Sequence, residues 1–147
     1  MIFWLASLFV QIHCLYAVSP NAPNNLRSYD KTNPVGTDDK PYFGWYVDDP
    51  DDNEIQTSYQ ILVASSRANL DKDNGDMWDS GRITSRKQNY IFYEGRPLSC
   101  ATRYFWKVRT WDKDDNVSSF SASAIFDTGL FVNNDWKGAK WIKRNTN

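Results

Sequence analysis

The sequence predicts an all-β protein, an antiparallel sandwich of about seven short strands. Three observations lead to this fold class. Short stretches rich in aromatic and β-branched residues recur along the chain, and several alternate apolar with polar positions, which is the period of a half-buried strand. Turn-forming residues separate these stretches. No segment after residue 20 keeps a helical period over three turns, so the crossover helices of a parallel sheet are not expected.

The strand-forming segments can be placed in order from their composition. In chain order we expect strands at 26–29, 41–47, 58–64, 89–93, 103–111 and 121–128, with 77–83 pairing at an edge. The segment 103–111 alternates most clearly, with Lys107 and Arg109 on the face opposite to its apolar residues. The inward positions of the early and central strands define the expected core, which contains Trp45, Tyr59, Ile61, Tyr104, Trp106 and Val108.

The connectors carry residues that form turns. Residues 48–53 make a polar loop, and Asn74-Gly75 and the segment 94–97 mark tight turns. Residues 112–116 separate the last two strands, and the glycosylation sequon at Asn116 begins in this loop.

The start of the predicted strand 103–111 carries a sequence pattern that is more specific for one kind of sandwich. Leu98 precedes Tyr104 by six residues, a spacing that fits a tyrosine corner, in which the phenol bonds to the backbone upstream. Trp45 lies on an early strand, and no pair of cysteines is placed to link the sheets. Within the immunoglobulin-like sandwiches, this combination favours the fibronectin type III variety.

The N-terminus has the character of an export signal. Residues 2–10 are apolar and small residues follow at Ala17 and Ser19, so we expect a signal peptide at 1–17 and a secreted or periplasmic product. No Lys or Arg precedes the apolar run, and a buried N-terminal strand or helix is the alternative. After cleavage the chain keeps one cysteine, Cys100, which excludes an intrachain disulfide. No membrane association is expected once the signal is removed.

Composition excludes several classes of function. The formal charge of −1 provides no basic surface for nucleic acid. The single histidine, His13, lies in the removable segment, which argues against a Ser-His-Asp site, a His-ligated metal and catalysis in general. Glu54 and Glu94 lie in polar connectors, and the acidic segment 71–76 departs from a calcium loop in its glycine position and its closing residue. We therefore expect no catalytic, cofactor-binding or metal-binding residue.

Four aromatic residues fall outside the expected core. Phe105 and Trp111 lie on the outer face of the strand 103–111, and Trp136 and Trp141 lie in the C-terminal tail. Exposed aromatic rings stack on the apolar C–H faces of sugars, and exposed apolar patches also mark contacts with other domains. The sequence leaves both roles open for these four residues.

The order of short motifs resembles the N-terminal domain of the α-L-rhamnosidases of glycoside hydrolase family 78. The matching pieces are LR at 26–27, NPVG at 33–36, PYFGW at 41–45, QTSYQILVAS at 56–65, MWDSG at 77–81, YEGRPL at 93–98, RYFWKVRTWD at 103–112, FDTGL at 126–130, DW at 135–136 and KWI at 140–142. Gly44 stands where that family commonly has a serine before the tryptophan, and Cys100 is unusual.

The resemblance implies a domain organisation and a function. It implies a fibronectin-like sandwich at 22–130 and a tail at 131–147 leading into further β domains and a helical catalytic barrel, before which this chain looks truncated. The family's catalytic carboxylates lie in that barrel, and no residue here matches them. The chain is then a non-catalytic domain of a secreted enzyme that releases terminal L-rhamnose, with the downstream domains and rhamnose-containing carbohydrate as partners.

The alternative is a stand-alone secreted fibronectin-like module for adhesion or carbohydrate binding. The segment 135–142 discriminates between the two, because its tryptophans have little to pack against in a finished sandwich.

Overall fold

A computed structural model describes residues 19–47, 55–140 and 142 of the chain. The expected signal peptide at 1–17, the whole polar loop 48–53 and Trp141 lie outside the described residues. Within the described ranges, no helix is long and apolar enough to cross a membrane.

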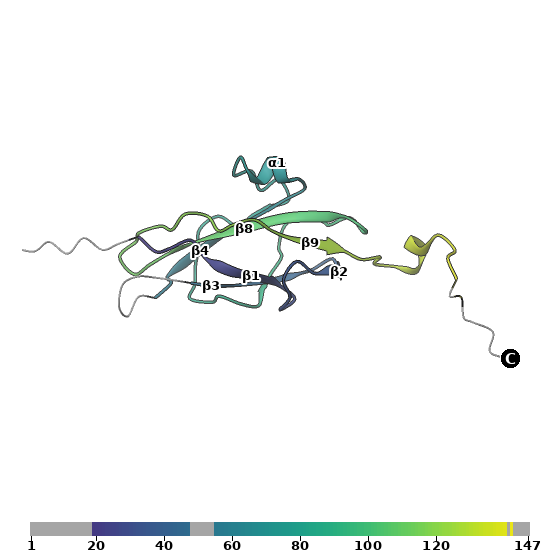
Figure 1. Ribbon diagram of the computed structural model, residues 1–147, viewed down its shortest axis with the longest axis horizontal. Coiled ribbons are helices and arrows are strands. Elements are labelled where there is room, and N and C mark those ends of the chain that lie inside the picture. Colours follow the sequence, from purple (N-terminus) through teal and green to yellow (C-terminus); the bar gives the residue numbers. More distant parts are fainter. Residues whose placement is uncertain (1–18, 48–54, 141, 143–147) are drawn as a thin grey trace, which may run out of the picture.

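Two β-sheets face each other, as Figure 1 shows, and the predicted all-β sandwich is confirmed. The three-stranded sheet has the order β1 (Asn24–Ser28), β3 (Tyr42–Tyr46) and β7 (Ile91–Phe92). The six-stranded sheet has the order β2 (Val35–Thr37), β9 (Ala124–Thr128), β8 (Arg103–Trp111), β4 (Ser58–Ala64) and β5 (Trp78–Asp79), with β6 (Ile83–Thr84) also on β4. The short β2 was not expected from the sequence.

The long strands β4 and β8 lie next to each other in the middle of the larger sheet. They pair antiparallel without interruption from Ser58 opposite Trp111 to Ala64 opposite Phe105. The register places the inward residues of both strands on one face, because side chains alternate along a strand. Among the described strands, β2 and β9 form the single parallel pair, and a shift in register between Val35 and Thr37 interrupts it.

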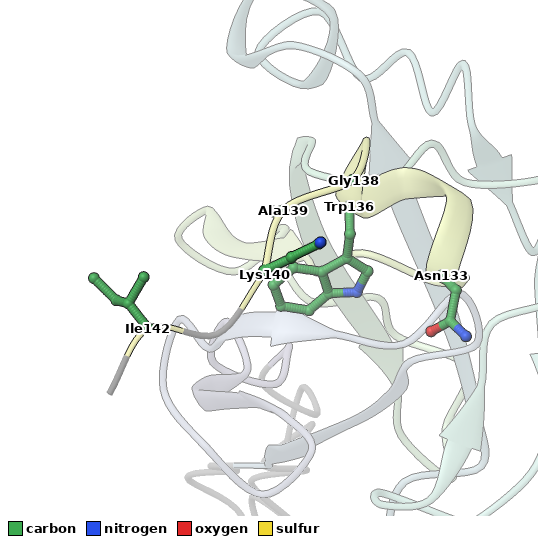
Figure 2. Close-up of a pocket in the computed structure, with 6 residues that line it drawn as sticks. All are labelled: Asn133, Trp136, Gly138, Ala139, Lys140 and Ile142. Atoms are coloured by element: carbon green, nitrogen blue, oxygen red, sulfur yellow. The ribbon is translucent and has the colours of Figure 1, made fainter. Parts of the chain in front are cut away.

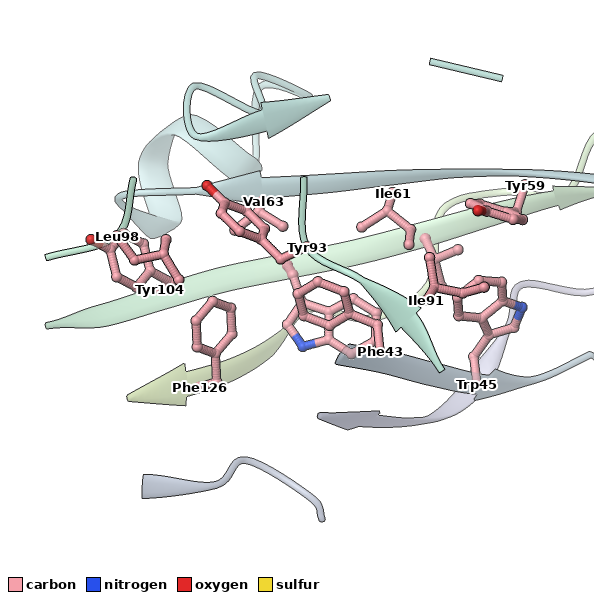
Figure 3. Close-up of a cluster of buried hydrophobic side chains, with 12 residues drawn as sticks. Phe43, Trp45, Tyr59, Ile61, Val63, Ile91, Tyr93, Leu98, Tyr104 and Phe126 are labelled. Atoms are coloured by element: carbon pink, nitrogen blue, oxygen red, sulfur yellow. The ribbon is translucent and has the colours of Figure 1, made fainter. Parts of the chain in front are cut away.

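The core between the sheets is dominated by aromatic rings. Trp106 is fully buried and packs against Phe43, with ring centroids 4.5 Å apart. Tyr104 and Phe126 stack at 5.5 Å, and Figure 3 shows these side chains meeting between the strands. The six residues that the sequence assigned to the core are all buried in this cluster: Trp45, Tyr59, Ile61, Tyr104, Trp106 and Val108.

The tyrosine corner forms as the spacing predicts. The hydroxyl oxygen of Tyr104 accepts a hydrogen bond from the backbone N–H of Ser99 at 2.8 Å. This bond joins the start of β8 to the loop before it, and Leu98 is buried beside it in the same core.

The outer face of the six-stranded sheet is covered by a short helix, α1 (Arg67–Leu70), which Figure 1 places on the side of β8 away from β1 and β3. The Ser66 side chain caps this helix by accepting from the N–H of Asn69 at 3.2 Å. Leu70 packs with Leu62 and Ala64 in a second, smaller apolar cluster. Four residues are too few to show a helical period, so the sequence did not reveal this helix.

The helix α1 and the turn that follows it bury Lys107 on the outer face of the sheet. This residue lies on the outer face, as its alternation predicts, but only 9% of it is exposed. Its ammonium group donates to the carbonyl of Leu70 at 2.7 Å and pairs with Asp73. The positive charge thus meets the C-terminal end of α1, where helix carbonyls lack internal partners.

Candidate functional site

Several of the described carboxylates pair with cations or accept hydrogen bonds from backbone groups. Arg103 binds Asp127 through two bonds of 2.7 and 2.8 Å, and this hydrogen-bonded guanidinium lowers the pKa of the Asp127 carboxyl. The hydrogen bond from Arg82 likewise lowers the pKa of Asp115. A general acid of a glycosidase needs the opposite shift, a raised pKa. Among the described residues, no group of three or more His, Cys, Asp or Glu is placed to hold a metal ion.

Two of the four aromatic residues singled out from the sequence are not exposed, and the expectation that they are was wrong. Phe105 is half-buried against the smaller apolar cluster under α1. Trp111 is 9% exposed, and two guanidinium groups lie over its ring, that of Arg82 at 4.7 Å and that of Arg109 at 5.1 Å from the ring centroid. The alternation along a strand predicts on which face of the sheet a side chain lies. It does not predict which loops or helices cover that face. Trp111 therefore offers little surface to a sugar or to another domain, whereas part of the Phe105 ring remains accessible.

The tail beyond β9 forms a structured, apolar end of the molecule. Phe131 still packs on the core, and the 3₁₀ helix η1 (Asn133–Trp136) follows. The Asp135 carboxylate holds this turn together, since it accepts from the backbone N–H groups of Phe131 and Val132 at 2.9 and 3.0 Å. Lys137 then takes a left-handed conformation with φ of 48°, and the chain reverses.

Apolar side chains gather on this segment without being covered. Leu130, Val132, Trp136 and Ile142 are exposed, with Trp136 at 46% and Ile142 at 96%. Figure 1 shows the segment projecting beyond the end of the two sheets. Trp136, Lys140 and Ile142 line a hollow of about 600 Å³. Figure 2 shows the Lys140 side chain beside the Trp136 indole. We call residues 130–142 the apolar tail.

A second candidate surface lies between β6 and β7, where the edges of the two sheets meet. A groove of about 430 Å³ opens there, and Tyr59, Trp78, Ile83, Tyr90 and Phe92 contribute its apolar walls. Lys87 and Glu94 add one positive and one negative charge. Burial, together with the nearby Glu94 carboxylate, raises the pKa of the Tyr59 phenol. We call this hollow the β6–β7 groove.

The aromatic rim of the groove is held in place by a ring behind it. Tyr90 and Phe92 are each 58% exposed. Tyr42 packs against both, at 5.2 Å from Tyr90 and 5.9 Å from Phe92. The hydroxyl of Tyr42 donates to Asp30 at 2.9 Å, which anchors the set. Sequence reasoning placed this segment in a strand but assigned no role to its rings. The alternation of Tyr90 and Phe92 with the buried Ile91 was the available signal.

Comparison with known proteins gives consistent matches. Residues 23–132 match a family model described as the Rha78A-like, N-terminal immunoglobulin domain. An α-L-rhamnosidase of Formosa agariphila is 40% identical over 113 residues, which cover 76% of this chain and 12% of that protein. The solved structure of α-L-rhamnosidase from Dictyoglumus thermophilum is 42% identical with a TM-score of 0.80, covering 84% of this chain and 14% of that one.

A further solved structure extends the set. The α-L-rhamnosidase of Streptomyces avermitilis, complexed with L-rhamnose, is 36% identical with a TM-score of 0.77. The match covers 84% of this chain and 12% of that chain. The chain thus spans only 12–14% of the length of these relatives.

Proposed function

Because the chain belongs to the family of Rha78A-like, N-terminal immunoglobulin domains, we propose that it is the leading, non-catalytic sandwich of an α-L-rhamnosidase-like glycoside hydrolase. Its role in this proposal is to dock onto the following domains and to stabilise and orient them. The parent enzyme releases terminal L-rhamnose from glycosides or polysaccharides. The relatives' names support this assignment of activity, and the apolar tail supports the docking role.

The observation that carries the docking role is the concentration of exposed apolar side chains on one projecting segment. Folded proteins rarely leave contiguous large apolar patches in water unless the patch contacts a partner. Here Val132 and Trp136 are exposed on a turn that the Asp135 carboxylate holds through two backbone hydrogen bonds, and Ile142 is exposed further along the tail. A preformed turn of this kind loses little conformational entropy when it docks.

The direction of the pKa shifts supports a non-catalytic role. Glycoside hydrolysis usually needs two carboxyl groups roughly 5–10 Å apart, one of them kept protonated by a raised pKa. Asp115 and Asp127 instead have lowered pKa values because each accepts from an arginine. In the proposed enzyme the reacting carboxylates come from later domains.

Export of the protein is part of the same proposal. The apolar run at 2–10, followed by small residues, supports a signal peptide at 1–17 and a secreted or periplasmic enzyme. Expression with the native N-terminus in a secreting host, followed by N-terminal sequencing of the product, tests this step. A mature product beginning at or near Val18 is expected, and an intact Met1 contradicts it.

A domain replacement tests the docking role. Residues 23–142 of this chain replace the matching region of the Streptomyces avermitilis α-L-rhamnosidase, and hydrolysis of a chromogenic α-L-rhamnoside and the thermal midpoint are measured. Since Trp136 lies in the proposed contact, Trp136→Ala should lower the thermal midpoint of the chimera. Tyr46→Ala is the matched control, because this ring is also exposed but lies on β3, away from the tail.

The result that contradicts the docking role is equally clear. If Trp136→Ala and Tyr46→Ala leave the chimera's midpoint and activity equally unchanged, the tail does not contact the following domains. A chimera that folds with its wild-type tail but is inactive with every α-L-rhamnoside, while the parent enzyme is active, also argues against the proposed role.

A further inference from the structure

We propose that the β6–β7 groove is a binding site for a neutral saccharide, which stacks on Tyr90 and Phe92 and hydrogen-bonds to the Tyr59 hydroxyl. This site is separate from the apolar tail and has a different task. It would let the domain hold a glycan chain while chemistry takes place elsewhere in the enzyme.

The shape of the groove suits a small ligand. Its volume of about 430 Å³ falls within the range of roughly 300–1,000 Å³ that is typical of small-molecule sites. The groove lies where β6, at the edge of the larger sheet, faces β7, at the edge of the smaller one. Walls from both sheets therefore enclose a ligand from two sides.

The rim supplies preorganised rings. Tyr90 and Phe92 are more than half exposed, yet Tyr42 packs against both and is itself hydrogen-bonded to Asp30. Pyranose rings present apolar C–H groups on one face, and an aromatic ring covers that face without needing to desolvate the hydroxyls. Rings already held in position lose little side-chain entropy on binding.

The Tyr59 hydroxyl is the polar group of the groove that lacks a protein partner and could bind a ligand. Tyr59 is 7% exposed, it lines the groove, and its hydroxyl makes no hydrogen bond with any described residue. By contrast, the hydroxyls of Tyr93 and Tyr104, which are also buried, each bond to backbone groups. The Tyr59 hydroxyl oxygen still reaches solvent in the groove, so a ligand bound there can replace water as its partner. A sugar hydroxyl in the groove provides the partner that the protein does not.

The charges of the groove select against charged ligands. Lys87 and Glu94 both line it, so its side chains sum to no net charge. A phosphate or carboxylate ligand would meet Glu94 as well as Lys87. Sugar hydroxyls both donate and accept, so a neutral saccharide can satisfy the ammonium and the carboxylate together.

The experiment is a titration of the 147-residue chain with sugars, followed by tryptophan fluorescence and by NMR shifts. The probes are L-rhamnose, a rhamnose-containing oligosaccharide and a gluco-oligosaccharide. Trp78 lines the groove and reports on binding there. We expect saturable binding in the millimolar range or tighter. Only the choice of L-rhamnose as a probe rests on the proposed function.

Variants locate the site. Tyr90→Ala and Phe92→Ala should each weaken binding by roughly tenfold, equivalent to about 1.4 kcal/mol. Tyr59→Phe keeps the ring and removes only the unpaired hydroxyl, and should weaken binding by about fivefold. Tyr46→Ala, at an exposed ring of the same sheet outside the groove, should leave the affinity unchanged. Circular dichroism confirms that each variant is folded.

Three outcomes overturn or redirect the proposal. No saturable signal with any of the probes removes the saccharide site and leaves the docking role untouched. Binding that survives Tyr90→Ala, Phe92→Ala and Tyr59→Phe places the sugar elsewhere and overturns the assignment of the groove. Binding of the gluco-oligosaccharide but not of either rhamnose probe supports the groove and counts against the rhamnose specificity of the proposed function.

Discussion

At the scale of single residues, the tryptophans divide into those that hold the sandwich and those that do not. Trp45 and Trp106 are almost fully buried, and the Trp45 indole donates to the Gln56 side chain at 3.0 Å. Gln56 in turn donates to the carbonyls of Ser85 and Lys87. The Trp45 side chain therefore connects the core to the loop that leads into the β6–β7 groove.

Removal of the core rings should be far more damaging than removal of the ring in the tail. Trp45→Ala and Trp106→Ala should each lower the free energy of unfolding by about 3–5 kcal/mol, because a large cavity is left in the core. Trp136→Ala in the same 147-residue chain should cost less than about 1 kcal/mol, since the ring is exposed. Urea unfolding measures all three. A loss for Trp136→Ala as large as for Trp106→Ala shows that the tail belongs to this core.

The ion pair between Arg103 and Asp127 gives a pH-dependent contribution. Because the guanidinium lowers the folded-state pKa of Asp127, the pair stabilises the fold above the unfolded-state pKa of about 3.9. This stability is lost as the pH falls through the lower folded-state value. Asp127→Asn should therefore be less stable than wild type at pH 7, and the difference should shrink below about pH 4.

Urea unfolding of both proteins across this pH range tests the pair. Asp114→Asn, at an exposed position, serves as the control for a change of surface charge. A difference between wild type and Asp127→Asn that stays constant down to acid pH contradicts the assigned role of the pair.

At the scale of elements, the strands with clear alternation were predictable and the covering pieces were not. In β8, Tyr104, Trp106 and Val108 alternate with outward residues, and that period alone fixes which of them face the core. The three-residue strand β2 contains Gly36 and pairs with β9, which lies far along the chain. No local sequence pattern therefore predicts this strand. The four residues of α1 carry no period either. Trp111 was therefore assigned correctly to a face but wrongly to solvent.

The same limit explains the candidate sites. Sequence analysis picked out Trp136 because the tryptophans of the segment 135–142 have little to pack against in a finished sandwich. It gave no role to Tyr59, Tyr90 and Phe92, because the groove arises only when the edge strands of two sheets come together.

The tyrosine corner is the element-level feature most open to a clean test. Tyr104→Phe keeps the ring in the core and removes the acceptor of the Ser99 N–H. Loss of this partly buried bond should lower the free energy of unfolding by about 1–3 kcal/mol. Tyr46→Phe, at an exposed ring on β3, should change the stability little. Thermal or urea unfolding distinguishes the two, and equal effects of both variants mean that the corner contributes nothing to stability.

At the scale of the whole molecule, the sandwich has two surfaces with different expected uses. The apolar tail extends from the end of β9, and the β6–β7 groove opens between the edges of the two sheets. The tail hollow and the groove are lined by separate sets of residues, so the two proposed roles use different side chains. Docking and sugar binding are thus compatible in one molecule.

Hydrogen exchange tests the central claim, docking through the apolar tail, most directly. Backbone exchange at 130–140 is compared between the 147-residue chain alone and the same segment within the Streptomyces avermitilis chimera. The docking role predicts that exchange in this segment slows by at least about tenfold in the chimera, because a covered turn opens less often. Amides of β6 and β7 should exchange equally in both. Equal exchange at 130–140 in the two proteins would contradict the claim that the following domains cover the tail.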